Sequence, residues 1–356
     1  MLILLGYNLF MEKMKVKLNW PLVGNRHIFE FLAKSLSNKN VSGSYIFAGP
    51  ANIGKNTAAH YFARSLVCES SNQPALSCGA CQACQEAIKG THSDIYLIKK
   101  ETDKKNISVD QIRGFIRSLG LSSFLNSYKI GIIRGADSLS EGAANALLKT
   151  LEESKVKVVI ILTVADIEVL PKTIISRSQI LRFQPVESDT IYDDLIKNHG
   201  ASRSQAKNFS RLAAGRPALA VKFLEDNEYC EDYKAKVQSF IDFLSPDLNQ
   251  RFKAIEKILG ERVHNQESAN LAGKIIDIWQ NLARDLMLED LGLADLVQHQ
   301  AFDKELAAMK NKLNQPAGQA GLKSLLSLIN ILKQAKEHIG FNVSPKLALE
   351  KAAVSL

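Results

Sequence analysis

The chain has 356 residues, of which 46% are hydrophobic and 23% charged; this excludes a disordered or fibrous protein and allows two or three domains. Its formal net charge of +8 is modest and no run of Lys and Arg forms a basic tail, so a polyanionic partner is permitted but not required. No stretch reaches the roughly 18 uninterrupted apolar residues of a membrane span, and we expect a cytoplasmic protein.

Residues 1–19 form an N-terminal extension that begins with a mostly apolar run. The run has no basic residue before it, contains Asn8 and lacks a small-residue cleavage site, so we do not interpret it as an export signal. Translation that starts at Met11 or Met14 would explain it more simply.

A glycine-rich loop is the first motif with a chemical meaning. An apolar run of strand length at residues 44–48 precedes the loop, and helix-forming residues follow it as far as Val67. In this context the pattern G-x-x-x-x-G-K binds phosphate through backbone N–H groups, the start of a helix and a lysine. The nucleotide-binding residues expected in the loop are Gly49, Pro50, Gly54, Lys55, Asn56 and Thr57.

One position of this loop departs from the pattern. The Ser or Thr that would hold Mg²⁺ directly after the lysine is replaced by Asn56, and Thr57 lies one residue late. An amide offers a metal only a neutral carbonyl oxygen, which argues against magnesium-dependent chemistry at this loop.

A cysteine cluster follows the predicted helix. Four cysteines within residues 68–84 have the spacing C-x9-C-x2-C-x2-C, at Cys68, Cys78, Cys81 and Cys84. Four thiolates at such spacings can surround Zn²⁺, and because all ligands are sulfur the predicted zinc site is structural. Cys230 stands alone and is expected to be a buried or idle thiol.

The rest of the N-terminal half alternates strands and helices. We predict strands at residues 94–98, 128–133, 156–163 and 179–183, and helices that begin near Ser108 and span 141–153. Ser108 and Gln111 form a capping-box pattern. The expected fold is therefore a doubly wound α/β domain over residues 20–185, with a parallel sheet and helices on both faces.

The strand at residues 128–133 ends without the acids that nucleotide hydrolysis needs. In hydrolases of this class, two acids at this place hold Mg²⁺ and polarise the attacking water. Here Arg134 and Gly135 occupy the two positions, and we interpret Asp137 as the cap of the next helix. A guanidinium can bind an anion, but it cannot ligate a cation or accept a proton.

The C-terminal half contains helical patterns and no strand pattern. After Pro185, three short helical patterns predict a small all-α lid at residues 186–228. Longer amphipathic patterns predict a second all-α domain at residues 229–356, with connections at 266–269 and 311–321.

Several motifs together resemble the bacterial clamp-loader branch of the AAA+ ATPases. They are Ser108-Val109-Asp110-Gln111-Ile112-Arg113, Ala136-Asp137-Ser138-Leu139, Ala144-Asn145-Ala146-Leu147-Leu148-Lys149-Thr150-Leu151-Glu152-Glu153, and Leu170-Pro171 with Ile174-Ile175-Ser176-Arg177-Ser178. The third string is the most specific of them. The resemblance covers residues 20–225 well and the C-terminal part weakly, through residues 342–350.

The resemblance implies roles for individual residues. The segment that lies near the adenine of bound ATP or ADP matches Val23, Gly24 and Asn25. Val164 and Ala165 replace the polar residue that senses the γ-phosphate, which is a further loss at the hydrolytic site. Arg177 matches the arginine finger that acts on a neighbouring subunit, with Ser178 in place of the usual cysteine. Arg216 is a candidate second sensor, although its spacing is off by a gap.

The resemblance also implies a function. The chain would be a non-hydrolysing subunit of the clamp-loader pentamer, which loads the sliding clamp on primed DNA together with ATP-hydrolysing motor subunits. Residues 229–356 would form the collar that holds the ring together, and helix N-termini such as that of 141–153 would face template phosphates. Two alternatives stay open: an active motor ATPase of the same family, and a zinc-stabilised nucleotide sensor or DNA-repair adaptor.

Overall fold

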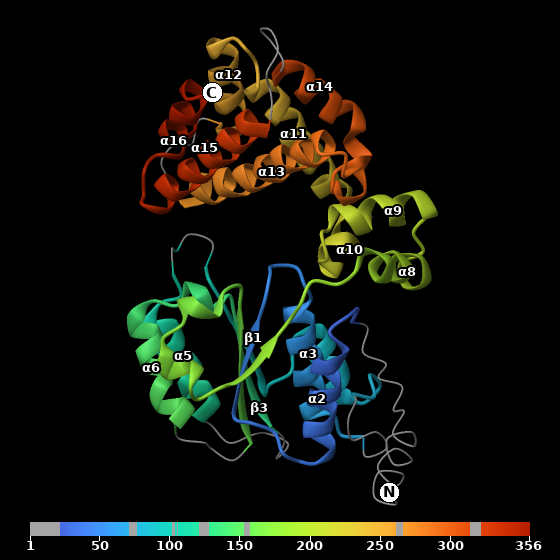
Figure 1. The fold of residues 1–356 in the computed structure, drawn as a ribbon. Coiled ribbons are helices and arrows are strands. Elements are labelled where there is room, and N and C mark those ends of the chain that lie inside the picture. Colours follow the sequence, from blue (N-terminus) through green and yellow to red (C-terminus); the bar gives the residue numbers. More distant parts are fainter. Residues whose placement is uncertain are drawn as a thin grey trace, which may run out of the picture. The chain divides into compact units, whose positions relative to one another are not determined.

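The computed structural model describes residues 22–70, 77–101, 104, 106–120, 128–152, 157–260, 266–313 and 322–356. It divides into two compact units, residues 1–187 and 188–356, which we describe separately (Figure 1). The predicted extension at residues 1–19, part of the cysteine segment and Glu153 lie outside the described residues.

The first unit is built on a parallel sheet. Within the described residues it has five strands: β1 (Ser44–Ala48), β2 (Ile95–Lys99), β3 (Lys129–Arg134), β4 (Val158–Val164) and β5 (Gln179–Arg182). Their order is β2-β3-β4-β1-β5, and every neighbouring pair is parallel. The predicted strands are confirmed to within about two residues at each end. β1, which leads into the glycine-rich loop, lies in the interior of the sheet between β4 and β5.

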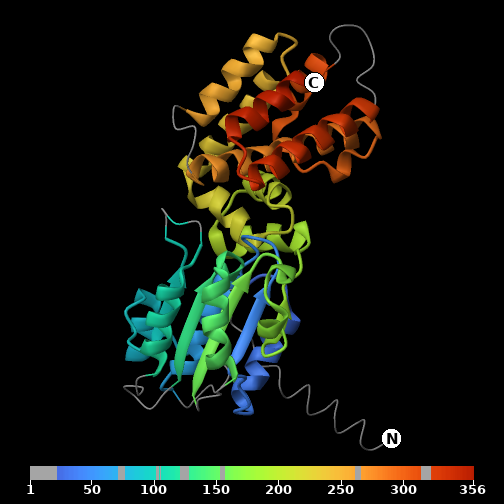
Figure 2. The ribbon, with the colours of Figure 1, turned by 90° about the vertical axis from the view of Figure 1, so that its left-hand side faces the viewer.

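Helices cover both faces of this sheet (Figure 2). Their bounds are α2 (Arg26–Ser37), α3 (Lys55–Val67), α4 (Gln82–Lys89), α5 (Val109–Gly120), α6 (Glu141–Glu152) and the short α7 (Lys172–Ile175), with 3₁₀ turns η1 (Ala136–Ser138) and η2 (Ile167–Val169). Alternate residues of one strand enter different cores, since successive side chains of a strand point to opposite faces. Ile132 packs with α2 and α3, whereas Ile133 packs with α5 and α6. The predicted doubly wound α/β arrangement is therefore confirmed.

Side-chain caps set the starts of α5 and α6. At α5 the predicted capping box is present: Gln111 N–H donates to Ser108 Oγ at 3.2 Å, and Ser108 N–H donates to Gln111 Oε1 at 2.9 Å. At α6 the predicted cap was wrong. Ser140 Oγ accepts from Ala143 N–H at 3.2 Å, while Asp137 lies in η1, four residues before the helix begins.

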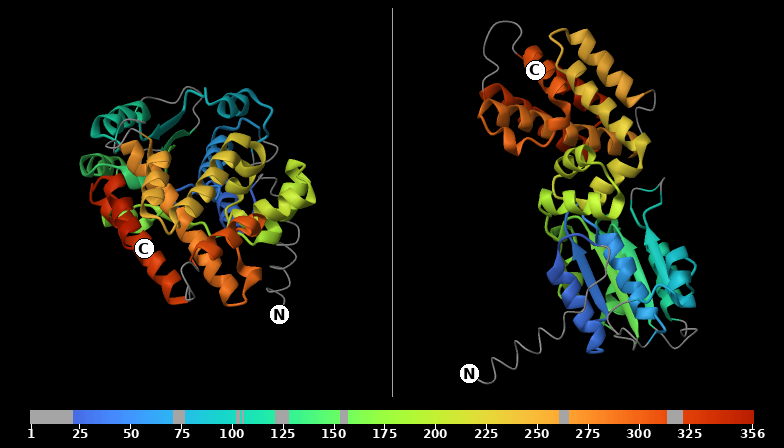
Figure 3. Two further views of the ribbon diagram at one scale, coloured as in Figure 1. Left: turned by 90° about the horizontal axis from the view of Figure 1, so that it is seen from above. Right: turned by 90° about the vertical axis from the view of Figure 1, so that its right-hand side faces the viewer.

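In the second unit, all described elements are helices (Figure 3). They are α8 (Ser188–His199), α9 (Arg203–Leu212), α10 (Pro217–Glu225), α11 (Asn227–Phe243), α12 (Leu248–Leu259), α13 (Gln266–Asp290), α14 (Asp303–Leu313), α15 (Leu322–Gly340) and α16 (Pro345–Val354), with 3₁₀ turns η3 (Ala294–Leu296) and η4 (Gln300–Phe302). The predicted connection at residues 266–269 was wrong, because these residues form the first turn of α13. No helix of the described residues combines the length and apolar character needed to cross a membrane.

A buried polar network holds the core of the second unit. Asp285 Oδ2 accepts hydrogen bonds from the backbone N–H of Gln298 at 3.0 Å and of His299 at 2.8 Å, and lies 2.6 Å from His299 Nδ1. His299 Nε2 in turn lies 2.7 Å from the hydroxyl of Tyr233. Asp285 and His299 are fully buried, so the network joins α11, α13 and the segment before η4 where water cannot replace a lost partner.

Candidate nucleotide site and its surroundings

The glycine-rich loop turns directly from the carboxyl end of β1 into α3. Gly49 and Gly54 have φ values of 146° and 100°, which side chains rarely permit. A Cβ atom at Gly49 would lie 2.6 Å from the carbonyl oxygen of Phe183, so backbone crowding also requires glycine there. Gly54 precedes the first residue of α3, and the loop therefore surrounds the N-terminal end of a 13-residue helix, where anions bind favourably.

Lys55 is folded back onto this loop. Its Nζ donates to the carbonyl oxygens of Gly49 and of Pro50, the latter at 2.6 Å. The residue is only 8% exposed. Burial lowers the pKa of Lys55 to about 8, because the ammonium loses water, and the charge of Asp137 opposes this shift more weakly. In this conformation the lysine satisfies carbonyl groups of the loop.

Asn56 is bonded to the sheet by its amide oxygen. Thr163 Oγ1 donates to Asn56 Oδ1 at 3.1 Å and accepts from the backbone N–H of Gly135 at 3.2 Å. Thr163 is 2% exposed. The carbonyl oxygen that position 56 could offer to a metal therefore already accepts a hydrogen bond, and the chain Asn56–Thr163–Gly135 links α3, β4 and the end of β3.

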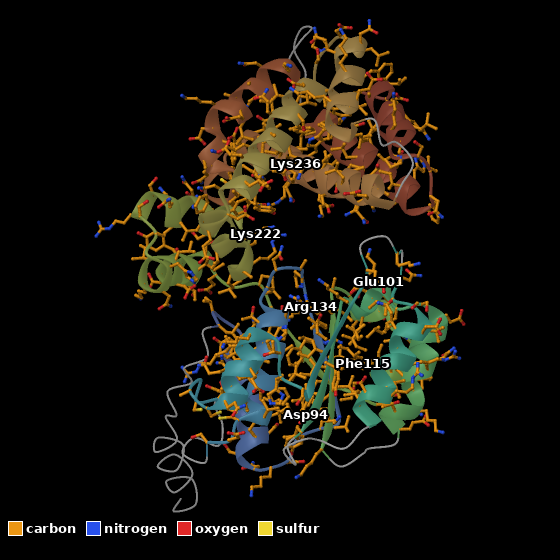
Figure 4. The ribbon with its side chains drawn as sticks, turned by 180° about the vertical axis from the view of Figure 1, so that it is seen from behind. Asp94, Glu101, Phe115, Arg134, Lys222 and Lys236 are labelled. Carbon is orange, nitrogen blue, oxygen red and sulfur yellow. The ribbon has the colours of Figure 1, made fainter. Side chains whose placement is uncertain are left out.

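Arg134 lies on the face of the sheet that α3 covers. The strand register pairs Arg134 with Thr163 and Thr163 with Phe47, so these side chains share one face of the sheet. Together with burial, which is the larger cause, the charge of Arg134 lowers the pKa of His60, which lies one helical turn after Asn56. Figure 4 shows Arg134 at the carboxyl ends of the strands and Asp94, the residue that precedes β2, at their amino ends.

The predicted adenine segment contacts the chain after β5. Asn25 Nδ2 donates to Gln184 O at 3.0 Å, and Asn25 Oδ1 accepts from Gln184 N–H at 2.7 Å. Gly24 has a φ of 71°, and a Cβ atom there would lie 2.3 Å from Val186 Cγ2. These contacts position the segment that contains Val23, whereas its role at the adenine stays a prediction.

The expected loss of the γ-phosphate sensor is consistent with the side chains at the end of β4. Val164 is 1% exposed, and its carbonyl oxygen accepts from Gly49 N–H at 3.2 Å. Its apolar side chain can contribute no polar contact to a phosphate.

The four cysteines converge as predicted. Their sulfur atoms all lie within 4.8 Å of one another, and Cys78 Sγ is 3.9 Å from Cys84 Sγ. Zn–S bonds of about 2.3 Å in a tetrahedron place sulfur atoms roughly 3.8 Å apart. Hydrogen bonds from the backbone N–H groups of Cys81 and Ala80 lower the pKa of the Cys78 thiol to about 6. Among the described residues this is the group of His, Cys, Asp and Glu side chains that could hold a metal ion.

Arg177 lies at the amino ends of the strands, whereas the glycine-rich loop lies at their carboxyl ends. β1 and β5 are parallel, with Tyr45 opposite Gln179, so Arg177 precedes the start of β5 whereas Gly49 follows the end of β1. The intervening strand is roughly 15 Å long. Arg177 is 35% exposed, and its guanidinium contacts Glu152 Oε1 at 2.6 Å and Thr173 O at 3.0 Å. With Ser44 and Lys149 it lines a cavity of about 310 Å³.

A parallel sheet with a glycine-rich phosphate loop after an interior strand, joined to a helical unit, defines a P-loop protein of the nucleotide-binding α/β class. Residues 24–187 match the family model described as "DNA polymerase III, delta subunit". Relatives include the tau subunit of DNA polymerase III from Bacillus subtilis, 29% identical over 94% of this chain and 60% of the relative, and subunit delta' from the same organism, 26% identical over 92% and 95%. The family model and these relatives support a member of the bacterial clamp-loader family of AAA+ proteins, the family that the motifs resemble.

Two further similarities cover different extents of the chain. Subunit delta' from Pseudomonas aeruginosa is 37% identical over 33% of this chain and 36% of the relative. Among solved structures, a gamma subunit-related protein from Thermotoga maritima matches with a TM-score of 0.44 and 18% identity, over 92% of this chain and 97% of that chain. The chain spans about 60% of the length of the tau relative and nearly all of the Bacillus delta' subunit.

Proposed function

We propose that this chain is a delta-prime-type subunit of the bacterial clamp loader: it does not hydrolyse ATP itself but supplies Arg177 to the nucleotide site of an adjacent motor subunit. Its partners would be the gamma/tau motor subunits and the delta subunit. The assembly would load the sliding clamp on primed DNA. The position of Arg177 carries the proposal, because it lies at the opposite end of the strands from the chain's own phosphate loop.

The surroundings of the loop support the absence of hydrolysis. Arg134 and Gly135 stand at the end of β3, and the carboxylate whose charge acts on Lys55 belongs to Asp137 in η1. Asn56 is bonded to Thr163 and not left open toward a metal. The loop would thus hold ATP or ADP without a group placed to activate water.

The position of Arg177 supports action in trans. A finger must reach a phosphate that its own domain does not bind, and its guanidinium must be accessible from outside. Arg177 meets both conditions, since a strand length separates it from Gly49 and a third of its side chain is exposed. In the chain alone it is paired with Glu152, a partner that a neighbour's phosphate would replace.

The cysteine cluster and the helical unit would have structural roles. Zn²⁺ bound by Cys68, Cys78, Cys81 and Cys84 would tie the segment before α4 to the end of α3. Residues 186–228 would form the lid and residues 229–356 the collar that joins the subunits.

Reconstitution tests the proposal. The purified chain is combined with the motor and delta subunits, and ATP hydrolysis is measured with primed DNA and the clamp. Arg177→Ala should reduce turnover at the site it faces by about 10³-fold or more, while assembly and zinc content stay unchanged. Arg203→Ala, which removes an exposed arginine of α9, is the control. Unchanged turnover with Arg177→Ala would refute the assignment.

The alternatives give different results. A motor subunit of this family would hydrolyse ATP alone and lose this activity on Lys55→Ala; the 29% identity to a tau subunit makes this comparison necessary. A nucleotide sensor or repair adaptor outside the replisome would fail to copurify with clamp-loader subunits.

A further inference from the structure

We propose that the phosphate loop of this chain binds the polyphosphate of a nucleotide without a magnesium ion, with the guanidinium of Arg134 supplying the positive charge that the metal would otherwise provide. The inference rests on the proposed nucleotide binding and specifies the form of ligand: a metal-free nucleoside diphosphate or triphosphate.

The first support is where the sheet directs the Arg134 side chain. Register partners in neighbouring strands present their side chains on the same face, and Phe47, Thr163 and Arg134 are such partners across β1, β4 and β3. The core on this face contains Phe47 together with Ala59 and Phe62 of α3. Arg134 therefore ends its strand on the side of the sheet that α3 covers.

The second support is the position of Arg134 along α3. Thr163, its neighbour in β4, bonds to Asn56 in the first turn of α3. The charge of Arg134 acts on His60, four residues later on the same side of the helix. Arg134 thus lies beside the first two turns of α3, the region where the helix N-terminus attracts an anion.

The third support is that the usual places of magnesium ligands are filled or lost. Asn56 Oδ1 accepts a hydrogen bond from Thr163, and Gly135 has no side chain. In the part of the chain that the structure describes, the cluster of side chains suited to a metal consists of the four cysteines. Since Mg²⁺ in phosphate sites is held by one or two carboxylates in addition to the phosphates, the loop offers it little.

The charges around the loop favour an anion even without a metal. Lys55 and Arg134 each contribute a positive charge, and the carboxylate acting on Lys55 is Asp137. The net charge of these three side chains is positive even without the partial positive charge of the N-terminus of α3. A phosphate would accept hydrogen bonds from the Lys55 ammonium in place of the carbonyl oxygens of Gly49 and Pro50, and Arg134 can offer a planar, bidentate donor pair.

The test is calorimetric titration of the full chain, loaded with zinc, with ADP. One buffer contains excess Mg²⁺; the other is magnesium-free and prepared without a chelator, because a chelator would also remove metal from the cysteine cluster. Binding should be as tight in the magnesium-free buffer as with Mg²⁺. Arg134→Ala and Arg134→Gln should each weaken binding by about tenfold or more in both buffers, as expected for loss of a charge-assisted hydrogen bond.

Lys99→Ala is the matched control. Lys99 is the register partner of Arg134 on β2, so it carries the same charge at the same carboxyl ends of the strands. Its side chain is exposed, and it lies one strand farther from Thr163 than Arg134 does. Its removal should leave ADP affinity unchanged. Binding that requires Mg²⁺, undetectable ADP binding, or equal affinity in folded Arg134 variants would each overturn the inference. None of these results touches the Arg177 experiment, so the two proposals fail separately.

Discussion

The buried lysine of the phosphate loop makes a pH dependence of stability testable. The pKa of Lys55 is lowered from 10.5 to about 8 in the folded chain, chiefly by burial. Between these two pH values the unfolded chain keeps a proton that the folded chain has released. The unfolded state therefore binds more protons, and the contribution of Lys55 to the free energy of unfolding rises as pH rises from about 8 to about 10.5.

The magnitude follows from the size of the shift. One pKa unit corresponds to about 1.4 kcal/mol, so the change from 10.5 to about 8 corresponds to about 3 kcal/mol over this pH window. Substitution by Met removes the titrating group while keeping a long side chain. Stability of the wild type relative to Lys55→Met should therefore increase by about 3 kcal/mol across the window, whereas Lys34→Met, at an exposed position of α2, should show no such change.

The measurement has to report on the first unit. Trp279 is buried in the second unit, so its fluorescence follows the wrong part of the chain. Hydrogen exchange of the backbone N–H groups of β1 and β4 gives the local free energy of opening instead. In parallel, ¹³C-methylated lysine signals, assigned through Lys55→Arg, give the pKa directly. A Lys55 signal that titrates near 10.5 would refute the reasoning.

Removing the metal with a chelator, or changing one ligand by Cys78→Ser, should lower the thermal stability of the first unit and abolish zinc content measured by mass spectrometry. Gly131→Ala should destabilise the same unit by about 1–3 kcal/mol in denaturant unfolding, because the added Cβ would lie 2.1 Å from Phe115 Cζ. His299→Ala should destabilise the second unit by about 3–5 kcal/mol, followed by tryptophan fluorescence, because it removes the side chain that pairs with Asp285 Oδ2 inside the buried core.

The strands were predictable because their sequences carry one strong physical signal. Residues 130–133 and 158–164 are nearly continuous in apolar character, a pattern typical of a strand that is covered on both faces by helices. The start of α5 was predictable for a different reason, since Ser108 and Gln111 satisfy each other locally. Signals of this kind are complete within a few neighbouring residues.

The errors arose where the partner was ambiguous or distant. Asp137 and Ser140 are both good caps, and only the 3₁₀ turn at residues 136–138 decides that Ser140 is placed correctly. Residues 266–269 contain polar residues typical of a connection, but they continue into the amphipathic α13. Neither outcome follows from propensity alone, because tertiary structure fixes where the helix begins.

The candidate site was predictable in its parts but not in its contacts. The loop and the four cysteines are recognised by spacing. The bond between Asn56 and Thr163 joins residues that are 107 positions apart, and no spacing rule connects them. The pair of Arg177 and Glu152 likewise depends on how α6 and α7 meet. The sequence indicated that hydrolytic groups are missing, whereas the structure identifies what contacts the remaining ones.

The sheet itself determines how the arginine and the phosphate loop relate within the first unit. β1 and β5 are hydrogen-bonded along their length, from Tyr45 opposite Gln179 to Ala48 opposite Arg182. At the amino ends of these two strands Ser44 Oγ lies 2.8 Å from Ser178 Oγ, and at their carboxyl ends Phe183 N–H donates to Ala48 O at 2.7 Å. Rotation about its side-chain torsions therefore cannot bring the guanidinium of Arg177 from the amino ends of the strands to the phosphate loop at their carboxyl ends. If Arg177 acts on a phosphate, it must therefore be the phosphate of a neighbouring subunit that approaches the amino ends of these strands.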